Sequence, residues 1–253
     1  MQFSKRHSEI LRILREEGTC SIIDLSQRLS VSLETIRRDV KPLANNGEVL
    51  KMHGAVALPY QMGEAPFERR MRENAQAKKA IARQAASHIQ DGDTVMLDTG
   101  TTTSLLAREL LKKRGLTIVT NSSDIARTLA TVNGDTVFMA GGELHGDNGA
   151  AFGPVAIEFI QRFKVHHAII SIGAVDSENG MMDYRLDEAE FAAMVLSRGD
   201  NAMIISDHSK FGRSGLIKVC DFSSVDIVIT DKQPNSDFQE IFREHDVRVE
   251  VAS

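Results

Sequence analysis

Val31-Ser32-Leu33-Glu34-Thr35-Ile36-Arg37-Arg38-Asp39-Val40 is the segment from which the organisation of the amino-terminal region is inferred. Ser32 can cap a helix that begins at Leu33, because a serine hydroxyl readily accepts a hydrogen bond from a free amide of the first turn. The helix is expected to continue to about Asn45, and Gly47 then provides a stop. The segment therefore predicts a helix with a well-defined start.

This predicted helix has two different faces. With about 100° per residue, one face is apolar and the opposite face is charged. The apolar face consists of Ile36, Val40 and Leu43, and the charged face of Glu34, Arg37, Arg38 and Lys41. Such a helix suits either the major groove of DNA or a plain three-helix unit with a solvated face. Arginine can contact a guanine edge or a phosphate, and the sequence leaves open which of the two arginines does which.

Two further helices are predicted before it. The first covers Ser4 to Glu17 and ends at Gly18. The second begins after Ser21, which has an acid three residues later in the position of a capping box. Its apolar residues recur at helical spacing, and Ser30-Val31 forms a short turn. Helix, short turn and cationic helix together make a helix-turn-helix.

A small hairpin is predicted directly after the cationic helix. Residues 48–57 are typical of two short strands joined by a turn near His53-Gly54. A hairpin in this position is a wing, in which Lys51 and His53 can meet the phosphate backbone or the minor groove. The wing favours DNA binding over the plain three-helix unit.

These two segments resemble the amino-terminal signature of the DeoR family of bacterial transcription regulators. The resemblance rests on Ser-x-x-Thr-Ile-Arg-Arg-Asp at 32–39 and on Lys-Met-His-Gly-Ala at 51–55. It implies DNA contacts by Thr35, Arg37 and Arg38. The full set of expected DNA-binding residues is Ser32, Thr35, Arg37, Arg38, Lys41, Lys51 and His53. Pro42 lies inside the predicted helix and is expected to bend it or to end it early.

The charge distribution supports a two-domain chain. The net charge of the 253 residues is −5, which taken alone argues against a nucleic-acid-binding protein. Residues 1–57, however, carry nine Lys and Arg against seven Asp and Glu, a net +2. The remaining residues carry 21 basic and 28 acidic side chains, a net −7. A mildly basic head thus precedes an acidic body.

The sequence gives no sign of secretion, membrane insertion or metal binding. The amino terminus lacks the apolar core of a signal peptide, and no apolar run approaches the roughly 20 residues of a membrane span. Two cysteines, Cys20 and Cys220, suggest neither a disulfide framework nor a zinc site. We therefore expect a cytoplasmic protein that has no cofactor, no metal and no membrane partner.

The rest of the chain predicts an α/β domain. We expect a winged helix-turn-helix domain at 1–57, a linker at 58–75 and an α/β effector-sensing domain at 76–253. In the last, short apolar runs alternate with helical segments, which favours a mostly parallel sheet. The predicted strands are Thr94–Leu97, Thr117–Thr120, Thr136–Met139, Ala168–Ile172, Ala202–Ser206, Ile227–Thr230 and Arg248–Val251. The predicted helices are Lys78–Ile89, Thr103–Lys113, Asp124–Val132, Val155–Arg162, Leu186–Ser197 and Asp237–Glu244.

Polar loops follow several of these strands, at the edge where parallel sheets bind ligands. The loop 98–104, Asp-Thr-Gly-Thr-Thr-Thr-Ser, combines hydroxyls with the free amides of a helix start, as anion sites do. A threonine-rich N-cap is the alternative. Asn121 follows the second strand, and a loop with five glycines, 141–153, follows the third. Asp176, Glu188 and Lys210 come after later strands, and taken singly each also suits an ordinary surface position.

Together these loops resemble the carboxy-terminal sensor domain of the DeoR family, so that the resemblance covers essentially the whole chain. This domain is similar in fold to pentose-phosphate isomerases, which implies a phosphorylated sugar or polyol as effector. The residues it implies as effector-binding are Asp98, Gly100, Thr101, Thr102, Thr103, Asn121, Gly141, Gly142, Asp176, Glu188 and Lys210.

Three functions are compatible with this organisation. The first is a transcription regulator, expected to be a repressor of carbohydrate or polyol metabolism, that binds operator DNA as a homo-oligomer (dimer or tetramer). The effector either releases or strengthens DNA binding, and release is our expectation. The second is a sugar-phosphate isomerase with a DNA-binding head, in which Glu188 and Lys210 act on the substrate. The third is an architectural DNA-binding protein. We favour the first and expect no enzymatic activity and no catalytic residue.

Overall fold

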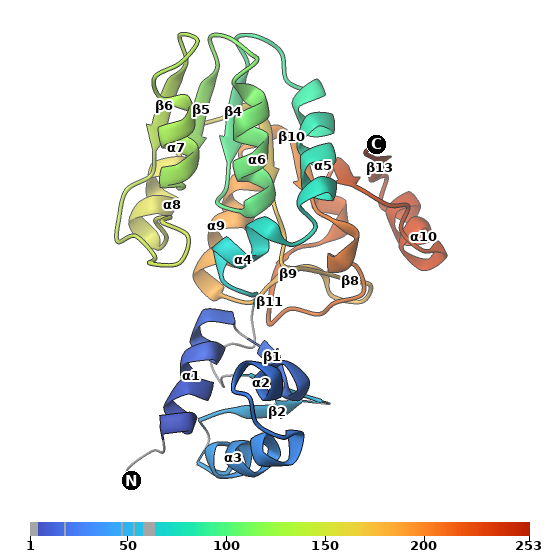
Figure 1. Ribbon diagram of the computed structural model, residues 1–253. Coiled ribbons are helices and arrows are strands. Elements are labelled where there is room, and N and C mark those ends of the chain that lie inside the picture. Colours follow the sequence, from blue (N-terminus) through green and yellow to red (C-terminus); the bar gives the residue numbers. More distant parts are fainter. Residues whose placement is uncertain (1–4, 18, 47, 53, 58–63) are drawn as a thin grey trace. The chain divides into compact units, whose positions relative to one another are not determined.

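The computed structural model describes residues 5–17, 19–46, 48–52, 54–57 and 64–253 of the chain (Figure 1). The chain divides into two compact units, residues 1–70 and 71–253. This division falls inside the predicted linker at 58–75. It also falls within a short helix, α4 (Phe67–Arg72).

The first unit is a three-helix domain with a small sheet. Its elements in chain order are α1 (Lys5–Glu17), β1 (Thr19–Ser21), α2 (Ile22–Arg28), α3 (Leu33–Asn45), β2 (Leu50–Met52) and β3 (Ala55–Ala57). Strands β2 and β3 form the predicted hairpin, and β1 pairs antiparallel with the other side of β3. Strand β1 was not predicted, because three residues are too few to show an alternating pattern. The fold is a winged helix-turn-helix.

Both predicted helix caps are confirmed. The hydroxyl of Ser21 accepts a hydrogen bond from the amide of Asp24 at 2.9 Å, and that of Ser32 from the amide of Thr35 at 3.2 Å. The early end expected at Pro42 is wrong, since α3 continues to Asn45. Pro42 is exposed, so its ring lies on the solvent side of α3. The buried apolar face keeps the remaining turn helical at the loss of one backbone hydrogen bond.

A partly buried ion pair supplements the apolar core of this unit. The core contains Ile10, Leu14, Leu25, Ile36, Val40 and Leu43, all fully buried. Asp39 of α3 is 8% exposed and accepts hydrogen bonds from the Arg6 guanidinium of α1, with Nη2 to Oδ1 at 3.2 Å. His7 Nε2 lies 3.7 Å from the same carboxylate. The last residue of the Thr-Ile-Arg-Arg-Asp motif therefore holds α1 against α3.

The second unit is a three-layer α/β domain. Its helices are α5 (Ala75–Ser87), α6 (Thr101–Leu110), α7 (Ser123–Leu129), α8 (Pro154–Ile160), α9 (Leu186–Ser197) and α10 (Ser236–Glu244), with short 3-10 turns at His208–Lys210 and Phe222–Ser224. The strands of its large sheet are β4 (Thr94–Leu97), β5 (Thr117–Thr120), β6 (Thr136–Met139), β7 (Val165–Ile170), β10 (Gly199–Ile205), β12 (Ile227–Thr230) and β13 (Arg248–Val251). The predicted α/β class is confirmed.

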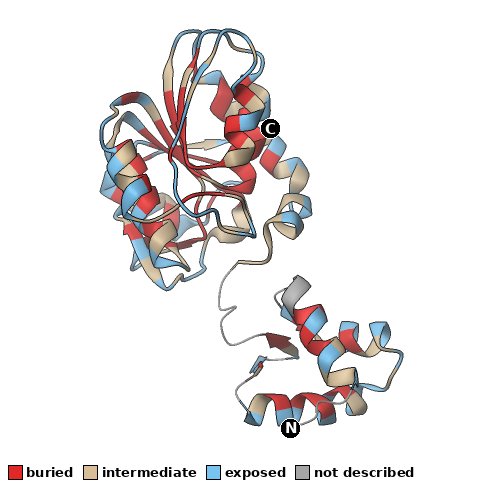
Figure 2. Ribbon diagram, turned by 90° about the vertical axis from the view of Figure 1, so that its left-hand side faces the viewer, coloured by how far each residue is buried: buried red, intermediate tan, exposed pale blue. Residues whose placement is uncertain are grey.

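All neighbouring strands of the large sheet run parallel, in the order β13-β12-β10-β7-β4-β5-β6. Side chains on one face pack against α5, α6 and α7, and those on the other face against α8, α9 and α10. Figure 2 shows the result of this packing: buried residues lie along the central strands and on the inner sides of the helices. The chain builds the sheet outward from β4 in one direction and then from β7 in the other. The switch point of this doubly wound sheet lies between β4 and β7.

A second, antiparallel sheet of three strands was not predicted. It consists of β8 (Ala174–Asp176), β9 (Gly180–Asp183) and β11 (Ile217–Cys220), in the order β11-β9-β8. Strands β8 and β9 are short and contain a single β-branched residue, Val175, so they lack the pattern of a strand. Strand β11 (Ile-Lys-Val-Cys) does alternate, but over only four residues. Several predicted boundaries also need correction. Strands β7 and β10 begin earlier than predicted, at Val165 and Gly199, and so do helices α5 and α6, at Ala75 and Thr101. Helices α6 and α7 end earlier than predicted, at Leu110 and Leu129.

The Asp39 ion pair gives a stability prediction. Asp39→Ala should lower the free energy of unfolding of the first unit by about 1 kcal/mol, because it removes the hydrogen bonds that join the buried Asp39 carboxylate of α3 to α1. Chemical denaturation of residues 1–70, followed by circular dichroism, would measure the loss. Arg37→Ala on the exposed side of the same helix is the control and should change stability by less than about 0.5 kcal/mol. Equal stability of the two variants would contradict a structural role for Asp39.

Candidate DNA-binding and effector sites

The exposed face of α3 carries the residues predicted to contact DNA. Arg37 and Arg38 are exposed, and the Arg37 side chain retains 64% of its accessible surface. Its Nη1 lies 3.8 Å from a carboxylate oxygen of Glu34, an exposed pair that competes little with a phosphate. Lys41 is exposed on the next turn. The helix thus presents three cations to solvent.

The start of α3 is held by its own side chains. Besides accepting from the amide of Thr35, the hydroxyl of Ser32 lies 2.8 Å from the hydroxyl of Thr35. Both hydroxyls are at the amino-terminal end of the helix, whose dipole favours a phosphate. Ser32 and Thr35 therefore form one polar group at the tip of α3.

The wing supplies one further exposed cation. Lys51 lies on β2 opposite Val56 of β3 and is exposed. Gly54 has a φ of +75°, the left-handed conformation that a tight turn between these strands requires. The other predicted wing contact, His53, lies outside the described residues.

In the second unit, the predicted effector residues gather around the switch point of the sheet. Asp98 directly follows β4, and Ser171 directly follows β7. The amide of Ser171 donates to both carboxylate oxygens of Asp98, at 3.1 and 3.3 Å. This hydrogen bond joins the two strand ends between which open α/β sheets bind ligands. Ser171 was not among the predicted site residues.

A close approach of the Gly100 backbone to the Ser171 side chain positions the start of α6. Gly100 is the N-cap residue of α6, and a Cβ atom there would lie 2.0 Å from the Ser171 hydroxyl. Thr101, Thr102 and Thr103 follow in the first turn and are buried. The Thr103 hydroxyl donates to the carbonyl of Gly100 at 3.1 Å. The absence of a side chain at Gly100 lets the helix start beside the β7 loop.

Several buried polar atoms near this helix start have no hydrogen-bond partner within the described part of the chain. They are Thr99 Oγ1, Ser104 Oγ and Asn121 Oδ1. Asn121 is fully buried, and its Nδ2 donates to the carbonyl of Ala151 at 2.9 Å, which fixes the amide. Buried acceptors and hydroxyls without partners are costly, so this arrangement is typical of groups that a ligand engages.

Three carboxylates lie on one side of the site. Burial is the main cause that raises the pKa of Asp98 well above its ordinary value of 3.8, against the hydrogen bond from the Ser171 amide. The negative charges of Asp183 and Glu188 raise it further. Glu188 is in the first turn of α9, as predicted, whereas Asp183 ends the unpredicted strand β9. In its protonated form the Asp98 carboxyl group can donate as well as accept a hydrogen bond.

Two lysines lie near a fourth carboxylate, Asp207. Lys78 is in the first turn of α5 and only 4% exposed, which is rare for a lysine. Lys210 ends the short turn that Asp207 begins. Although burial raises the pKa of Asp207, hydrogen bonds from Ser209 and the charges of both lysines lower it overall. Neither Lys78 nor Asp207 was predicted as a site residue. The one signal in the sequence for Lys78 is its position on the apolar side of an amphipathic helix.

Two other groups of predicted residues have contacts of their own. Oδ1 of Asp176 accepts from the amides of Glu178 and Asn179, both at 2.9 Å, so its carboxylate shapes the β8–β9 turn. These bonds lower the pKa of Asp176. Gly141 and Gly142 are exposed at the start of the glycine-rich loop. Farther along this loop, His145 Nε2 lies 3.2 Å from Asp187 of α9.

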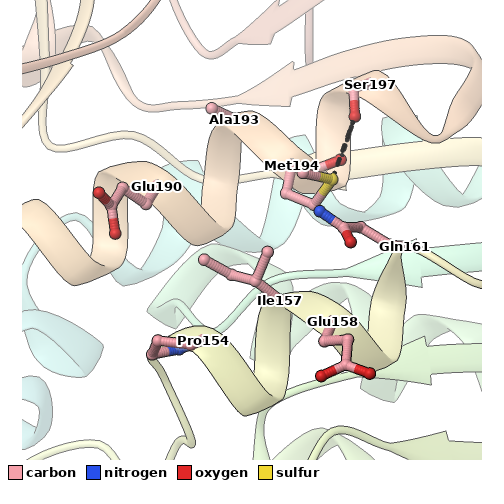
Figure 3. Close-up of a pocket in the computed structure, with 8 residues that line it drawn as sticks. All are labelled: Pro154, Ile157, Glu158, Gln161, Glu190, Ala193, Met194 and Ser197. Atoms are coloured by element: carbon pink, nitrogen blue, oxygen red, sulfur yellow. Dashed lines mark hydrogen bonds between the residues drawn. The ribbon is translucent and has the colours of Figure 1, made fainter.

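A separate shallow groove runs between α8 and α9 (Figure 3) and has a volume of about 700 Å³. It is lined by Pro154, Ile157, Glu158, Gln161, Glu190, Ala193, Met194 and Ser197. Two of these residues are carboxylates and none is a cation. The groove is therefore unsuited to a phosphorylated ligand.

The buried charge of Asp98 gives a prediction that links stability to pH. Asp98→Asn keeps an acceptor for the Ser171 amide but carries no charge, so the variant should melt at a higher temperature than the natural protein. About 1 kcal/mol corresponds to roughly 2–4 °C. A raised folded pKa means that the cost of Asp98 grows as pH rises above its ordinary value of 3.8. Thermal melts should therefore show a larger gain near pH 8 than near pH 5. A gain that is independent of pH would contradict the buried charge.

The contact at Gly100 gives a second prediction. Gly100→Ala should destabilise the second unit by about 1–3 kcal/mol, because the new methyl group overlaps the Ser171 hydroxyl. The backbone of Gly100 is extended, with a φ of 177°, so the effect is steric alone. Adding Ser171→Gly to the same chain should restore most of the lost stability. Thermal melts of the two variants would measure this, and a double variant no more stable than Gly100→Ala would contradict it.

Comparison with known proteins agrees with this arrangement of two sites. The chain matches the family model described as a DeoR-like helix-turn-helix domain over residues 6–61. It also matches the model described as the DeoR C terminal sensor domain over residues 73–232. Among the described residues no helix is long and apolar enough to cross a membrane, and no group of three or more His, Cys, Asp or Glu side chains could hold a metal ion.

Curated relatives of similar length carry the names of regulators. The chain is 32% identical to a glycerol-3-phosphate regulon repressor of Escherichia coli K12, over 99% of this chain and 100% of that protein. It is 32% identical to the transcriptional repressor AccR of Agrobacterium fabrum, over 89% of this chain and 88% of that protein. It is 26% identical to the regulator IolR of Bacillus subtilis, over 98% of both chains.

A solved structure of ribose 5-phosphate isomerase A from Methanocaldococcus jannaschii is also similar to part of the chain. Its TM-score is 0.40 at 16% identity, and the match covers 55% of each chain. This likeness is too weak to bear on substrate or catalysis. The two family models and the full-length match to a curated repressor are decisive: this chain belongs to the DeoR family of transcription regulators.

Proposed function

We propose that this regulator is a repressor of a carbohydrate or polyol regulon and that a phosphorylated sugar or polyol, bound at the switch point of its sensor sheet, controls it. The start of α6 is the observation that carries this proposal. There Gly100 brings free helix amides and three threonines beside the strand ends of β4 and β7. A helix start at a switch point is the usual place for a phosphate in an α/β fold.

The charges around the α6 start fit a phosphorylated ligand that is uncharged at its other end. Lys78 and Lys210 supply positive charge near Asp207, and Thr101 to Thr103 supply hydroxyls. Carboxylates repel a second anion but accept hydrogen bonds from sugar hydroxyls. We therefore assign the phosphate to Gly100, Thr101, Thr102 and Thr103, and the hydroxyls to Asp98, Asn121 and Glu188. The roles of Gly141, Gly142, Asp176 and Lys210 in effector binding belong to the same proposal.

The head is proposed to read DNA through α3 and its wing. Ser32 and Thr35 suit phosphates at the tip of the helix, and Arg37, Arg38 and Lys41 suit base edges and phosphates in the major groove. Lys51 and His53 of the wing are proposed as backbone contacts. The operator is proposed to be two-fold symmetric and bound by a homo-oligomer, a dimer or a tetramer. A bacterial repressor acts on the chromosome, which places the protein in the cytoplasm.

We further propose that the sensor binds its ligand without turnover. The curated relatives are named as repressors and regulators, and the isomerase hypothesis lacks such support. Incubation with ribose 5-phosphate followed by an assay for the ketose would test this. Ketose formation above the level of a Glu188→Gln variant would overturn the proposal that the chain is not an enzyme.

An operator-binding experiment tests the main proposal. An operator duplex selected from a random library is labelled, and protein binding is followed by fluorescence anisotropy. Glycerol 3-phosphate is the first probe, because a relative that matches the whole chain is named for that regulon. We expect the probe to release the operator, since binding to one of two states shifts the equilibrium towards it. Failure of glycerol 3-phosphate and of a panel of sugar phosphates to change operator binding would overturn the effector assignment.

Paired variants separate the two sites. Arg38→Ala should weaken operator binding by about tenfold or more, which corresponds to about 1–3 kcal/mol, because it removes a cation from the helix in the groove. Thr101→Val combined with Thr102→Val should leave operator binding unchanged but abolish the response to the probe. Thr136→Val on the exposed edge strand β6 is the matched control and should alter neither. Loss of operator binding by the double threonine variant would contradict separate sites.

A further inference from the structure

Asn74 has an unusual backbone conformation at the start of α5. Its φ is +52°, in the left-handed region that non-glycine residues seldom adopt. It is the N-cap residue of α5, but its side chain makes no capping hydrogen bond to the helix. Asparagine is preferred at this position because its side chain normally caps the helix. The side chain of Asn74 is thus used for another contact.

That contact reaches across the sequence to the effector site. Nδ2 of Asn74 donates to Oδ1 of Asp207 at 2.9 Å and lies 3.4 Å from the hydroxyl of Ser209. Asp207 is 2% exposed and lies two residues after the end of β10. The same Oδ1 accepts from the amide of Ser209 at 3.0 Å, which starts the turn that carries Lys210. One buried oxygen therefore holds both the N-cap residue of α5 and the loop that carries a proposed effector contact.

The first turn of α5 makes a second connection to this loop. The amide of Lys78 donates to the carbonyl of Asn74 at 3.0 Å, so the two residues belong to one helical turn. The buried ammonium of Lys78 acts on Asp207, as does that of Lys210. An anion that binds either lysine changes the electrostatic environment of the Asp207 carboxylate. The same carboxylate accepts the hydrogen bond from Asn74.

Asn74 also stands where the sensor chain continues towards the head. Only Glu73 separates it from α4, and Met71 at the end of α4 packs against the core formed by α5, α6 and α7. In chain order α4 leads through residues 58–66 to the winged domain. The first turn of α5 is therefore adjacent, along the chain, to the segment that leads to the head.

We infer that Asn74 is a positioning residue that couples the effector site to the segment leading to the DNA-binding head, by tying the Asp207–Lys210 loop to the first turn of α5. The inference rests on the proposed function and adds its route of regulation. It requires that loss of the Asn74 side chain separates effector binding from operator release. Coupling of this kind is a free energy between two sites, so it can be lost while both sites still bind.

Two substitutions test the coupling without forcing the backbone. Asn74→Gly keeps the left-handed conformation and removes the side chain. Asn74→Asp keeps the shape but places a carboxylate against Asp207. Both variants should bind operator as the natural protein does, and Asn74→Gly should bind glycerol 3-phosphate within about threefold, measured by thermal shift. In both, the concentration of glycerol 3-phosphate needed to release the operator should rise about tenfold or more, or release should be lost.

Asn133 offers a matched control within the same unit. It has a φ of +55°, and its Nδ2 donates to the carbonyl of Leu111 at 2.6 Å. Asn133→Gly and Asn133→Asp make the same chemical changes at a site with no contact to the effector loop among its recorded hydrogen bonds. Release of the operator by glycerol 3-phosphate should be unchanged in both.

The outcomes are distinguishable. Normal release by Asn74→Gly would overturn the coupling and leave the proposed function intact. A parallel loss of probe binding and release would assign Asn74 to the binding site itself and would also overturn the coupling. A natural protein that binds operator but neither binds nor responds to glycerol 3-phosphate, ribose 5-phosphate or the other sugar phosphates would overturn the proposed function, and the coupling with it.

Discussion

The sensor domain depends on the hydrogen bond between the amide of Ser171 and the carboxylate of Asp98. These residues follow β7 and β4, the two strands from which the sheet grows in opposite directions. At this point the helix crossovers leave in opposite directions, so the strand ends are not covered by a connecting segment. The contact also explains Gly100, because a side chain there would overlap Ser171. The contact between Ser171 and Asp98 thus sets the position of the α6 start, where we propose that a phosphate binds, relative to the carboxylates of the site.

The same contact has a cost in stability. Asp98 is buried beside Asp183 and Glu188, and its pKa is raised, which means that its charged form is destabilised in the folded protein. Residues that lower the stability of the folded protein are typical of binding sites. Asp39 of the head shows the opposite case, since its carboxylate is also buried but faces Arg6 and stabilises the packing of α1 against α3. Of these two buried aspartates, Asp39 therefore stabilises the fold, whereas Asp98 is proposed to serve a binding site.

The sequence allowed the seven strands of the large sheet to be predicted because most are short apolar runs bounded by polar turns, and the last, Arg248–Val251, alternates charged and apolar residues. The small sheet of β8, β9 and β11 was missed, since Gly180-Met181-Met182-Asp183 has neither alternation nor β-branched residues. The acidic half of the site was predicted only in part for this reason, as Asp183 ends β9. Lys78, Asp207 and Ser171 were missed for another reason. Their roles depend on which residues of distant segments they face, and a charge or hydroxyl in a helix or loop carries no such information. The predicted site residues on both units remain predictions that only binding experiments test.

The packing of α5 gives a physical basis for the proposed coupling between effector binding and operator release. It packs against α6, whose first turn is proposed to hold the phosphate, and against β10 and β12, which lead into the Asp207 loop and the adjacent strand end. A ligand that contacts both the α6 start and Lys210 therefore acts on two elements that share α5 as a neighbour. Close-packed interfaces of this kind change between discrete arrangements rather than deform continuously. Because α5 is the first long element of the sensor after the segment that comes from the head, a rearrangement of its first turn has a direct covalent route to the DNA-binding domain.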